Sequence, residues 1–169
     1  MTRLADACDT INRAVGAVVM WLALIMVLLQ FGVVLLRYVF GFSSIFLNES
    51  VLYLHATIFM LGAGYTLWAQ GHVRVDIFYA RFPAHRKALV DLLGHLFLLV
   101  PSVLMLLYWS WPMVHRSWAI LEGPISVGGI PASFLLKSLV PAFCLLLLVQ
   151  GVSALIRDVI RLQETRDGA

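Results

Sequence analysis

Long apolar runs separated by short polar segments set the pattern of this chain. Four such runs, at about residues 15–36, 48–69, 88–111 and 132–156, contain very few charged side chains. At about 1.5 Å per helical residue, each run is long enough to cross about 30 Å of hydrocarbon. A helix also satisfies its own backbone hydrogen bonds, which a span in lipid requires. The pattern therefore predicts an all-α integral membrane protein, a single domain of four transmembrane helices.

A short segment between the second and third runs has a different pattern. Val75, Phe78, Tyr79 and Phe82 fall at positions i, i+3, i+4 and i+7 of a helix and would form one apolar face. Such a segment can lie in the headgroup region with its aromatic rings pressed towards the acyl chains. We therefore expect a short interfacial amphipathic helix at about residues 72–83. An ordinary connector between two spans is the alternative interpretation.

The distribution of basic residues predicts the topology. Cytoplasmic loops of membrane proteins carry an excess of lysine and arginine. The two terminal segments and the loop between spans two and three carry Arg3, Arg13, Arg74, Arg81, Arg86, Lys87, Arg157, Arg161 and Arg166. The opposite side carries Arg37, Arg116 and Lys137. Both termini and the middle loop are therefore predicted to be cytoplasmic.

The composition agrees with a membrane protein and narrows the functional classes. Hydrophobic residues make up 62% of the 169 residues and charged residues 12%, whereas soluble domains carry about 25% charged residues. The sequence pI of about 9.1 fits basic loops beside a membrane, and no basic-aromatic pattern points to a nucleic-acid partner. Cys8 and Cys144 are far apart and form no C-x-x-C pair, which disfavours a disulfide or a metal site.

No motif in the sequence points to catalysis, and two histidines raise a haem hypothesis. The G-x-S-x-G, H-E-x-x-H and glycine-rich phosphate-binding patterns do not occur in the sequence. His55 and His95 lie within predicted spans, as the haem ligands of four-helix membrane cytochromes do. The span boundaries place their rings about 10 Å apart along the membrane normal, whereas one iron needs both rings at nearly one level. Interhelical hydrogen bonds are the favoured role for both, and no cofactor or metal is expected.

Few polar side chains lie inside the predicted spans, which bears on a transport role. An autonomous exporter would need charged groups near the bilayer centre, but Glu49 and Lys137 lie only near the outer ends of their spans, where they could pair with each other. The predicted core is essentially uncharged, which favours a scaffold over a carrier. Gly62 and Gly64 would let another backbone approach closely, either within this bundle or from a partner. Pro101 predicts a kink in the third span.

Two sequence segments carry a resemblance to a known family. The first is the second span with its exit, with Glu49 at the start, then L-G-A-G, then G-H-V-R-V-D. The second is E-G-P-I-S-V-G-G-I-P, followed by Lys137 and Pro141 and by L-V-Q-G before the basic C-terminal segment. Over most of its length the chain resembles the small membrane (Q) subunit of TRAP transporters, the tripartite ATP-independent periplasmic solute carriers. Many members have two adjacent acids where this chain has Asn48-Glu49.

The resemblance implies a location, partners and a role. It implies a multi-pass protein of the bacterial inner membrane that is bound to a large M subunit, which carries sodium and substrate. A periplasmic substrate-binding protein would deliver an organic acid, and the small subunit would act as a scaffold in contact with lipid. The polar positions that match the family and are expected to be structural or interface residues are Glu49, His72, Arg74, Asp76, Glu122 and Lys137. A haem-binding redox anchor and an autonomous small exporter remain the alternatives to a scaffold subunit.

Overall fold

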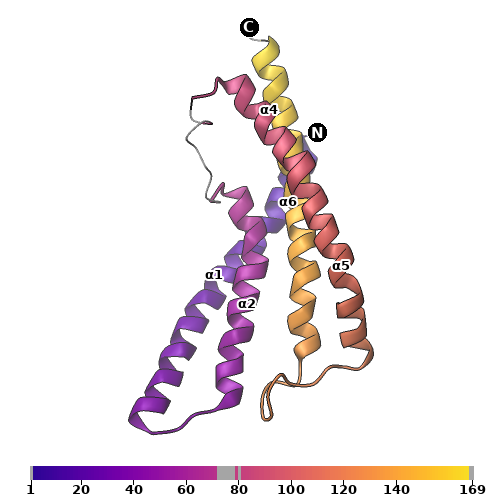
Figure 1. The fold of residues 1–169 in the computed structure, drawn as a ribbon. Coiled ribbons are helices and arrows are strands. Elements are labelled where there is room, and N and C mark those ends of the chain that lie inside the picture. Colours follow the sequence, from indigo (N-terminus) through magenta and orange to yellow (C-terminus); the bar gives the residue numbers. More distant parts are fainter. Residues whose placement is uncertain (1, 72–78, 80, 168–169) are drawn as a thin grey trace.

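The protein is a bundle of long helices in its computed structural model, which describes residues 2–71, 79 and 81–167 (Figure 1). The helices are α1 (Thr2–Val39), α2 (Ile45–Trp68), α4 (Ala84–Gly94), the π-helical turn η1 (His95–Leu99), α5 (Val100–Ala119) and α6 (Ser133–Asp167). Because α4, η1 and α5 follow one another directly, the described chain has four helices long and apolar enough to cross a membrane. The all-helical, four-span prediction is confirmed.

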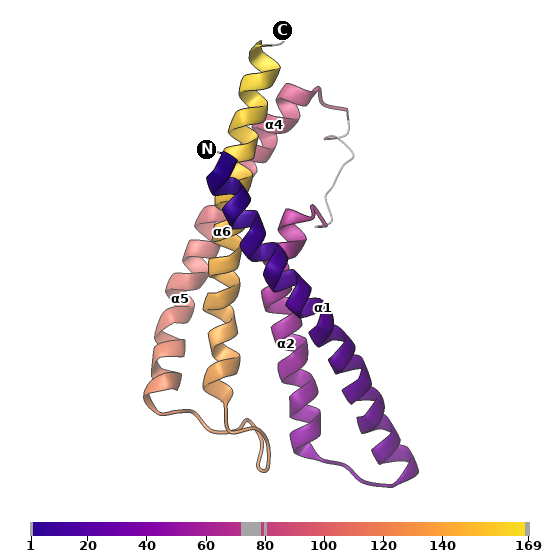
Figure 2. The same ribbon diagram turned by 180° about the vertical axis from the view of Figure 1, so that it is seen from behind.

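The two ends of the bundle differ in shape. Both termini and α4 lie at one end, here called the termini end, and the α1–α2 and α5–α6 connections lie at the other, the loop end (Figures 1 and 2). α1 and α6 cross near the termini end, and the α1–α2 hairpin then diverges from the α5–α6 hairpin towards the loop end. Both termini on one side of an even number of spans agree with the predicted topology, while the membrane orientation itself stays a prediction.

α6 is the central helix of the bundle. It contacts α1, α2, α4 and α5, and 33% of its most apolar window is buried, against 6% in each of the other three spans. A small cluster formed by Val103, Cys144 and Leu147 is the best-buried apolar part. Cys8 and Cys144 are both free thiols. Most of the apolar surface of the other helices is therefore left for lipid or for another protein.

The helices extend well beyond the predicted spans at the termini end. α1 begins at Thr2 instead of near residue 15, and α6 continues to Asp167 beyond the predicted end near residue 156. The third long helix covers Ala84–Ala119. Apolar runs mark only the part of a helix that faces lipid, and the polar extensions of α1 and α6 are held instead by contacts with each other, described below.

The third long helix is irregular near Pro101, where the sequence predicts a kink. Proline has no backbone N–H to donate and its ring collides with the preceding turn. The π-helical turn His95–Leu99 lies just before it, with the Val100 N–H bonded to the His95 carbonyl. Isolated π-turns of this kind are frequent at functional sites, and this one contains His95.

The predicted interfacial helix at residues 72–83 falls mostly outside the described residues. Residues 72–78 and 80 are not described, so the prediction is not tested. Of its last positions, 81–83 are non-helical and Pro83 is the N-cap of α4. The side chain of Tyr79 reaches α4, where its hydroxyl donates to Asp91 Oδ2 at 2.7 Å.

Candidate functional site

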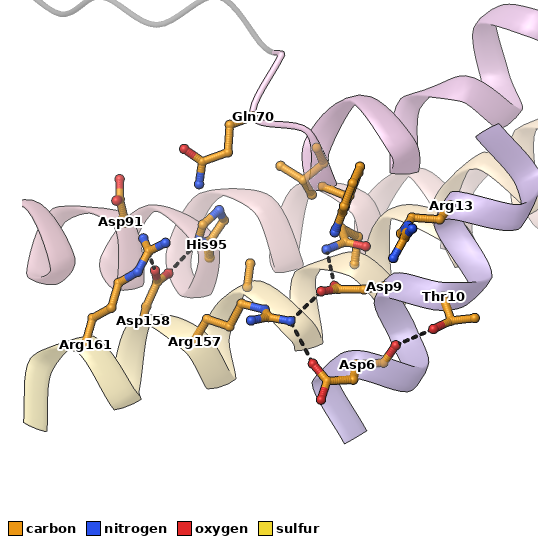
Figure 3. A pocket seen from close by; sticks show the side chains of 14 residues that line it. Asp6, Asp9, Thr10, Arg13, Gln70, Asp91, His95, Arg157, Asp158 and Arg161 are labelled. Carbon is orange, nitrogen blue, oxygen red and sulfur yellow. Dashed lines mark hydrogen bonds and ion pairs between the residues drawn. The ribbon is translucent and has the colours of Figure 1, made fainter. Parts of the chain in front are cut away.

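A buried carboxylate in α1 organises the polar contacts at the termini end. Asp9 is only 7% exposed. Its Oδ1 accepts hydrogen bonds from Ser153 Oγ at 2.6 Å and Gln150 Nε2 at 2.9 Å. Its Oδ2 accepts one from Arg157 Nη2 at 2.5 Å (Figure 3). All three donors belong to α6, where positions i, i+3 and i+7 share a face. A desolvated carboxylate is costly unless it is paired and hydrogen-bonded, and Asp9 has both kinds of partner.

One helical turn further into the bundle, Asn12 continues this contact between α1 and α6. It is fully buried, and its Nδ2 donates to Gln150 Oε1 at 3.0 Å. Its Oδ1 has no hydrogen-bond partner among the described residues and lies against Gly64 of α2. A Cβ at Gly64 would overlap this oxygen and would lie 3.3 Å from Leu146 Cβ. Gly64 therefore serves the packing of this chain's own three helices.

A second buried carboxylate joins α6 to the π-helical turn. His95 Nδ1 and Asp158 Oδ2 are 2.8 Å apart, and the Asp158 side chain is only 4% exposed. Arg161 Nη1 lies 3.9 Å from Asp158 Oδ1 (Figure 3). The predicted interhelical hydrogen bond of His95 is thus confirmed. His55 differs, because it is exposed and makes no hydrogen bond within the described part of the chain.

The loop end is held by a third buried carboxylate with a different kind of partner. Glu49, near the start of α2, is 7% exposed. Its two oxygens accept backbone N–H groups from Ser126 at 3.1 Å and Ile130 at 2.7 Å, both in the α5–α6 connection. A Cβ at Gly129 would overlap this carboxylate, so glycine there allows the close approach. Gly128 has a φ of +84°, a conformation that glycine adopts without strain.

Lys137 pairs with Glu122, which corrects the suggested pairing with Glu49. Lys137 Nζ contacts Glu122 Oε2, and Ser117 Oγ donates to the same oxygen at 2.5 Å. Hydrogen bonds from Lys137 and Ser117 lower the pKa of Glu122 below its usual range. The Glu49 carboxylate instead accepts hydrogen bonds from two backbone amides of the α5–α6 connection, because this connection folds over the start of α2.

The predicted site residues therefore fall into three groups. Glu49, Glu122 and Lys137 lie at the loop end. Glu49 joins the α5–α6 connection to α2, and the contact of Glu122 with Lys137 joins it to α6. Gly62 and Gly64 lie on helix α2, with Gly62 near Val19 of α1. His72, Arg74 and Asp76 lie outside the described residues.

The termini-end network was missed by the sequence interpretation, which treated the core as essentially uncharged. Asp9, Gln150 and Asp158 are all buried. A signal existed for Asp9, because Ala5, Asp9, Asn12 and Gly16 follow helical spacing into the first apolar run. The core is uncharged only between the two ends, since each buried carboxylate lies near an end of the bundle and has its partners there.

These contacts are suited to holding helices together. The three buried carboxylates have hydrogen-bond partners from this chain, and among the described residues no three His, Cys, Asp or Glu side chains are grouped as metal ligands would be. The contacts join α1 to α6, the π-helical turn to α6, and the α5–α6 connection to α2. They therefore fix how the two hairpins are joined.

Comparison with known protein families gives one match. Residues 26–161 match the family described as tripartite ATP-independent periplasmic transporters, DctQ component. No curated protein and no solved structure matches the chain. The family match covers the four membrane spans apart from the first part of α1, and it ends within the polar extension of α6.

Proposed function

We propose a scaffold role for this chain, which belongs to the family of the DctQ component of tripartite ATP-independent periplasmic (TRAP) transporters. The chain is thus the small membrane subunit of such a transporter and a multi-pass protein of the inner membrane, with four helices long enough to span it. The proposal adds that this subunit supports the large M subunit and binds no substrate itself.

The observation that carries this proposal is the small fraction of each span that the chain buries on its own. In three of the four spans only 6% of the most apolar window is buried. Within a bilayer, helices are held together by close packing and polar contacts, because lipid tails are as apolar as leucine. A thin, open bundle fastened at its two ends offers long lateral surfaces to a larger partner.

Among the described residues, the buried charged groups lie near the two ends of the bundle and not along a route through it. Intramembrane charges in carriers line ion or substrate routes, whereas Asp9, Glu49 and Asp158 lie near the ends of the bundle and bond to neighbouring helices or loops. We therefore assign substrate and coupling ion to the large subunit. The transported solute would be an organic acid delivered by a periplasmic binding protein, with sodium as the coupling ion. Which organic acid is carried would be set by the partner proteins and not by this chain.

One polar strip suggests where the large subunit binds. Gln30 of α1 and Asn48 and His55 of α2 line one cavity between these helices in the half nearer the loop end. All three are exposed, and exposed amide and imidazole groups are costly in contact with lipid tails. A transmembrane helix that presents hydrogen-bonding side chains would satisfy them, so we place the contact with the large subunit on this face.

The experiment is reconstitution with and without the partners. A tagged chain extracted in mild detergent should bring a large multi-span protein with it in equal amount. Vesicles with this chain alone should take up no organic acid, while vesicles with both membrane subunits and the binding protein should. A crosslinking amino acid at His55 should capture the large subunit, and the same group at Trp109 on the outer side of α5 serves as the comparison. Uptake by the chain alone would overturn the proposal.

A further inference from the structure

The seam between α1 and α2 contains a long apolar groove in the half nearer the termini end. The cavity has a volume of about 1040 Å³. Ala17 and Gly62 are small residues on the two sides of this space, and the Tyr65 ring packs on Gly16 beside it. Met20 and Phe59 line the part farthest from the termini end. The Phe59 side chain is 67% exposed and Met20 64% exposed. The groove therefore opens sideways, where acyl chains lie around a membrane protein.

The end of this groove nearest the termini carries a cation and an indole ring. The Arg13 guanidinium carbon lies 5.3 Å from the centroid of the Trp68 ring. Arg13 forms no ion pair within the described residues, whereas Arg157 is bonded to Asp6 and Asp9 (Figure 3). Arginine and tryptophan at the membrane interface suit the headgroup level, where one binds phosphate and the other has an amphipathic ring.

A second, polar cavity of about 560 Å³ begins where the groove ends. Arg13 and Trp68 line both cavities, so the apolar groove continues into a polar space. The polar space is also lined by carboxylates, including Asp6 and Asp91. A bare anion gains little in such mixed surroundings, whereas a headgroup attached to an apolar tail would use both cavities at once.

The length of the groove matches one leaflet. Phe59 and Trp68 are nine residues apart on α2, which corresponds to about 14 Å along the helix axis. Half of a hydrocarbon core is about 15 Å thick. The depth of the groove and the position of Arg13 at its termini end both favour a lipid.

We propose that this groove binds one membrane phospholipid, with its phosphate on Arg13 beside Trp68 and one acyl chain between α1 and α2. The lipid would lie in the space beside Ala17 and Gly62, next to the Tyr65 ring that packs on Gly16. It would thereby couple the α1–α2 hairpin to the leaflet at the termini end. This inference concerns the isolated chain and does not depend on the proposed transporter role.

The test is native mass spectrometry of the purified full-length chain released from nanodiscs of phosphatidylglycerol and phosphatidylethanolamine. The wild-type chain should retain one phospholipid. Arg13→Gln should reduce the retained fraction about tenfold, because a charge-assisted contact to phosphate is lost. Arg86→Gln on the exposed side of α4 is the matched control and should leave retention unchanged.

A second pair of variants tests the acyl-chain part of the groove. Gly62→Leu should block it, and a Cβ at this position meets only an ordinary contact, 3.6 Å from Val19 Cγ1. Gly32→Leu adds the same side chain to α1 where no atom lies within 4 Å, and should not alter retention. The melting temperature of each of the four variants shows whether it is folded. Lipid retention is compared only among variants that are folded.

Three results would overturn the proposal. Equal retention by Arg13→Gln and Arg86→Gln would mean that the cation binds no headgroup. Displacement of the lipid by excess inorganic phosphate would indicate a site for a bare anion. A crosslinking amino acid at Met20 that captures a protein of the assembled transporter instead of lipid would show that the groove is a subunit contact.

Discussion

The termini end and the loop end both bury a carboxylate, and they satisfy it in different ways. Asp9 is bonded by three side chains from one face of α6. Glu49 is bonded by two backbone amides of the α5–α6 connection. The first arrangement joins two long helices directly, whereas the second fastens a loop to the start of a helix. The same chemical group therefore fixes helix crossing at one end and loop position at the other.

This difference explains why the bundle is closed at one end and open at the other. Where α1, α4 and α6 meet, polar side chains lie between rigid helices and set their separation. Towards the loop end the two hairpins diverge, and the loop spans the gap between them (Figure 2). A loop can move with a partner more readily than packed helices can, so adjustment to the rest of a transporter is expected at the loop end.

The largest effect is expected from removing Asp9. Asp9→Ala removes the acceptor of the buried Gln150 amide and the buried partner of Arg157, and should destabilise the protein by about 3 kcal/mol. Asp6→Ala is the matched control, because Asp6 also pairs with Arg157 but its side chain is 64% exposed; its effect should stay below about 1 kcal/mol. Thermal unfolding in detergent, followed by circular dichroism, measures both. Equal losses would mean that burial of Asp9 is unimportant.

The helix crossing gives the next effect. Gly64→Ala should cost about 2 kcal/mol, because the new methyl group overlaps the buried Asn12 side chain and α1 must shift. Gly62→Ala, two positions away on the same helix, should change stability by less than about 0.5 kcal/mol, since its methyl group meets only an ordinary contact. A similar cost for both would show that the contact of Gly64 with Asn12 does not set the crossing.

Loss of Glu49 should act locally. Glu49→Ala should cost about 1–2 kcal/mol and should speed hydrogen exchange at the amides of Ser126 and Ile130 about tenfold, because each loses its acceptor. Exchange at the termini end should not change. Asn48→Ala is the control, since its side chain bonds only to the Ser44 carbonyl in the same turn. Faster exchange throughout the chain would show that the two ends are not independent.

The smallest effect is a pH dependence at the loop end. The pKa of Glu122 is lowered by Lys137 and Ser117 from the ordinary value of 4.5. The contribution of this carboxylate to stability is therefore fully present above about pH 4.5 and is lost as the pH falls through the lowered pKa. The melting temperature of the wild-type chain should show a small decrease in that acid range, and Lys137→Met should remove most of it. If Lys137→Met shows the same decrease in melting temperature as the wild-type chain, the decrease comes from other carboxylates.

The sequence predicted some site residues and missed others for a physical reason. Glu49, Glu122 and Lys137 stand out because they are charges at the edges of apolar runs, and all three take part in contacts at the loop end. Asp9 and Asp158 stand in segments that carry several charged residues, where one more charge stands out less than at the edge of an apolar run. Only the packing of α1 and the π-helical turn on α6 removes them from water.

The number of spans and the membrane location followed from the sequence alone, because apolar length is a property of consecutive residues and the bilayer thickness is fixed. The tertiary structure decided the pairing of charges, the reach of α1 and α6 beyond the apolar runs, and the fastening of the loop by Glu49. Each of these depends on groups that are distant in the chain, such as Asp9 with Arg157 or Glu49 with Ile130. Sequence spacing carries no information on such pairs until the helices have been placed beside one another.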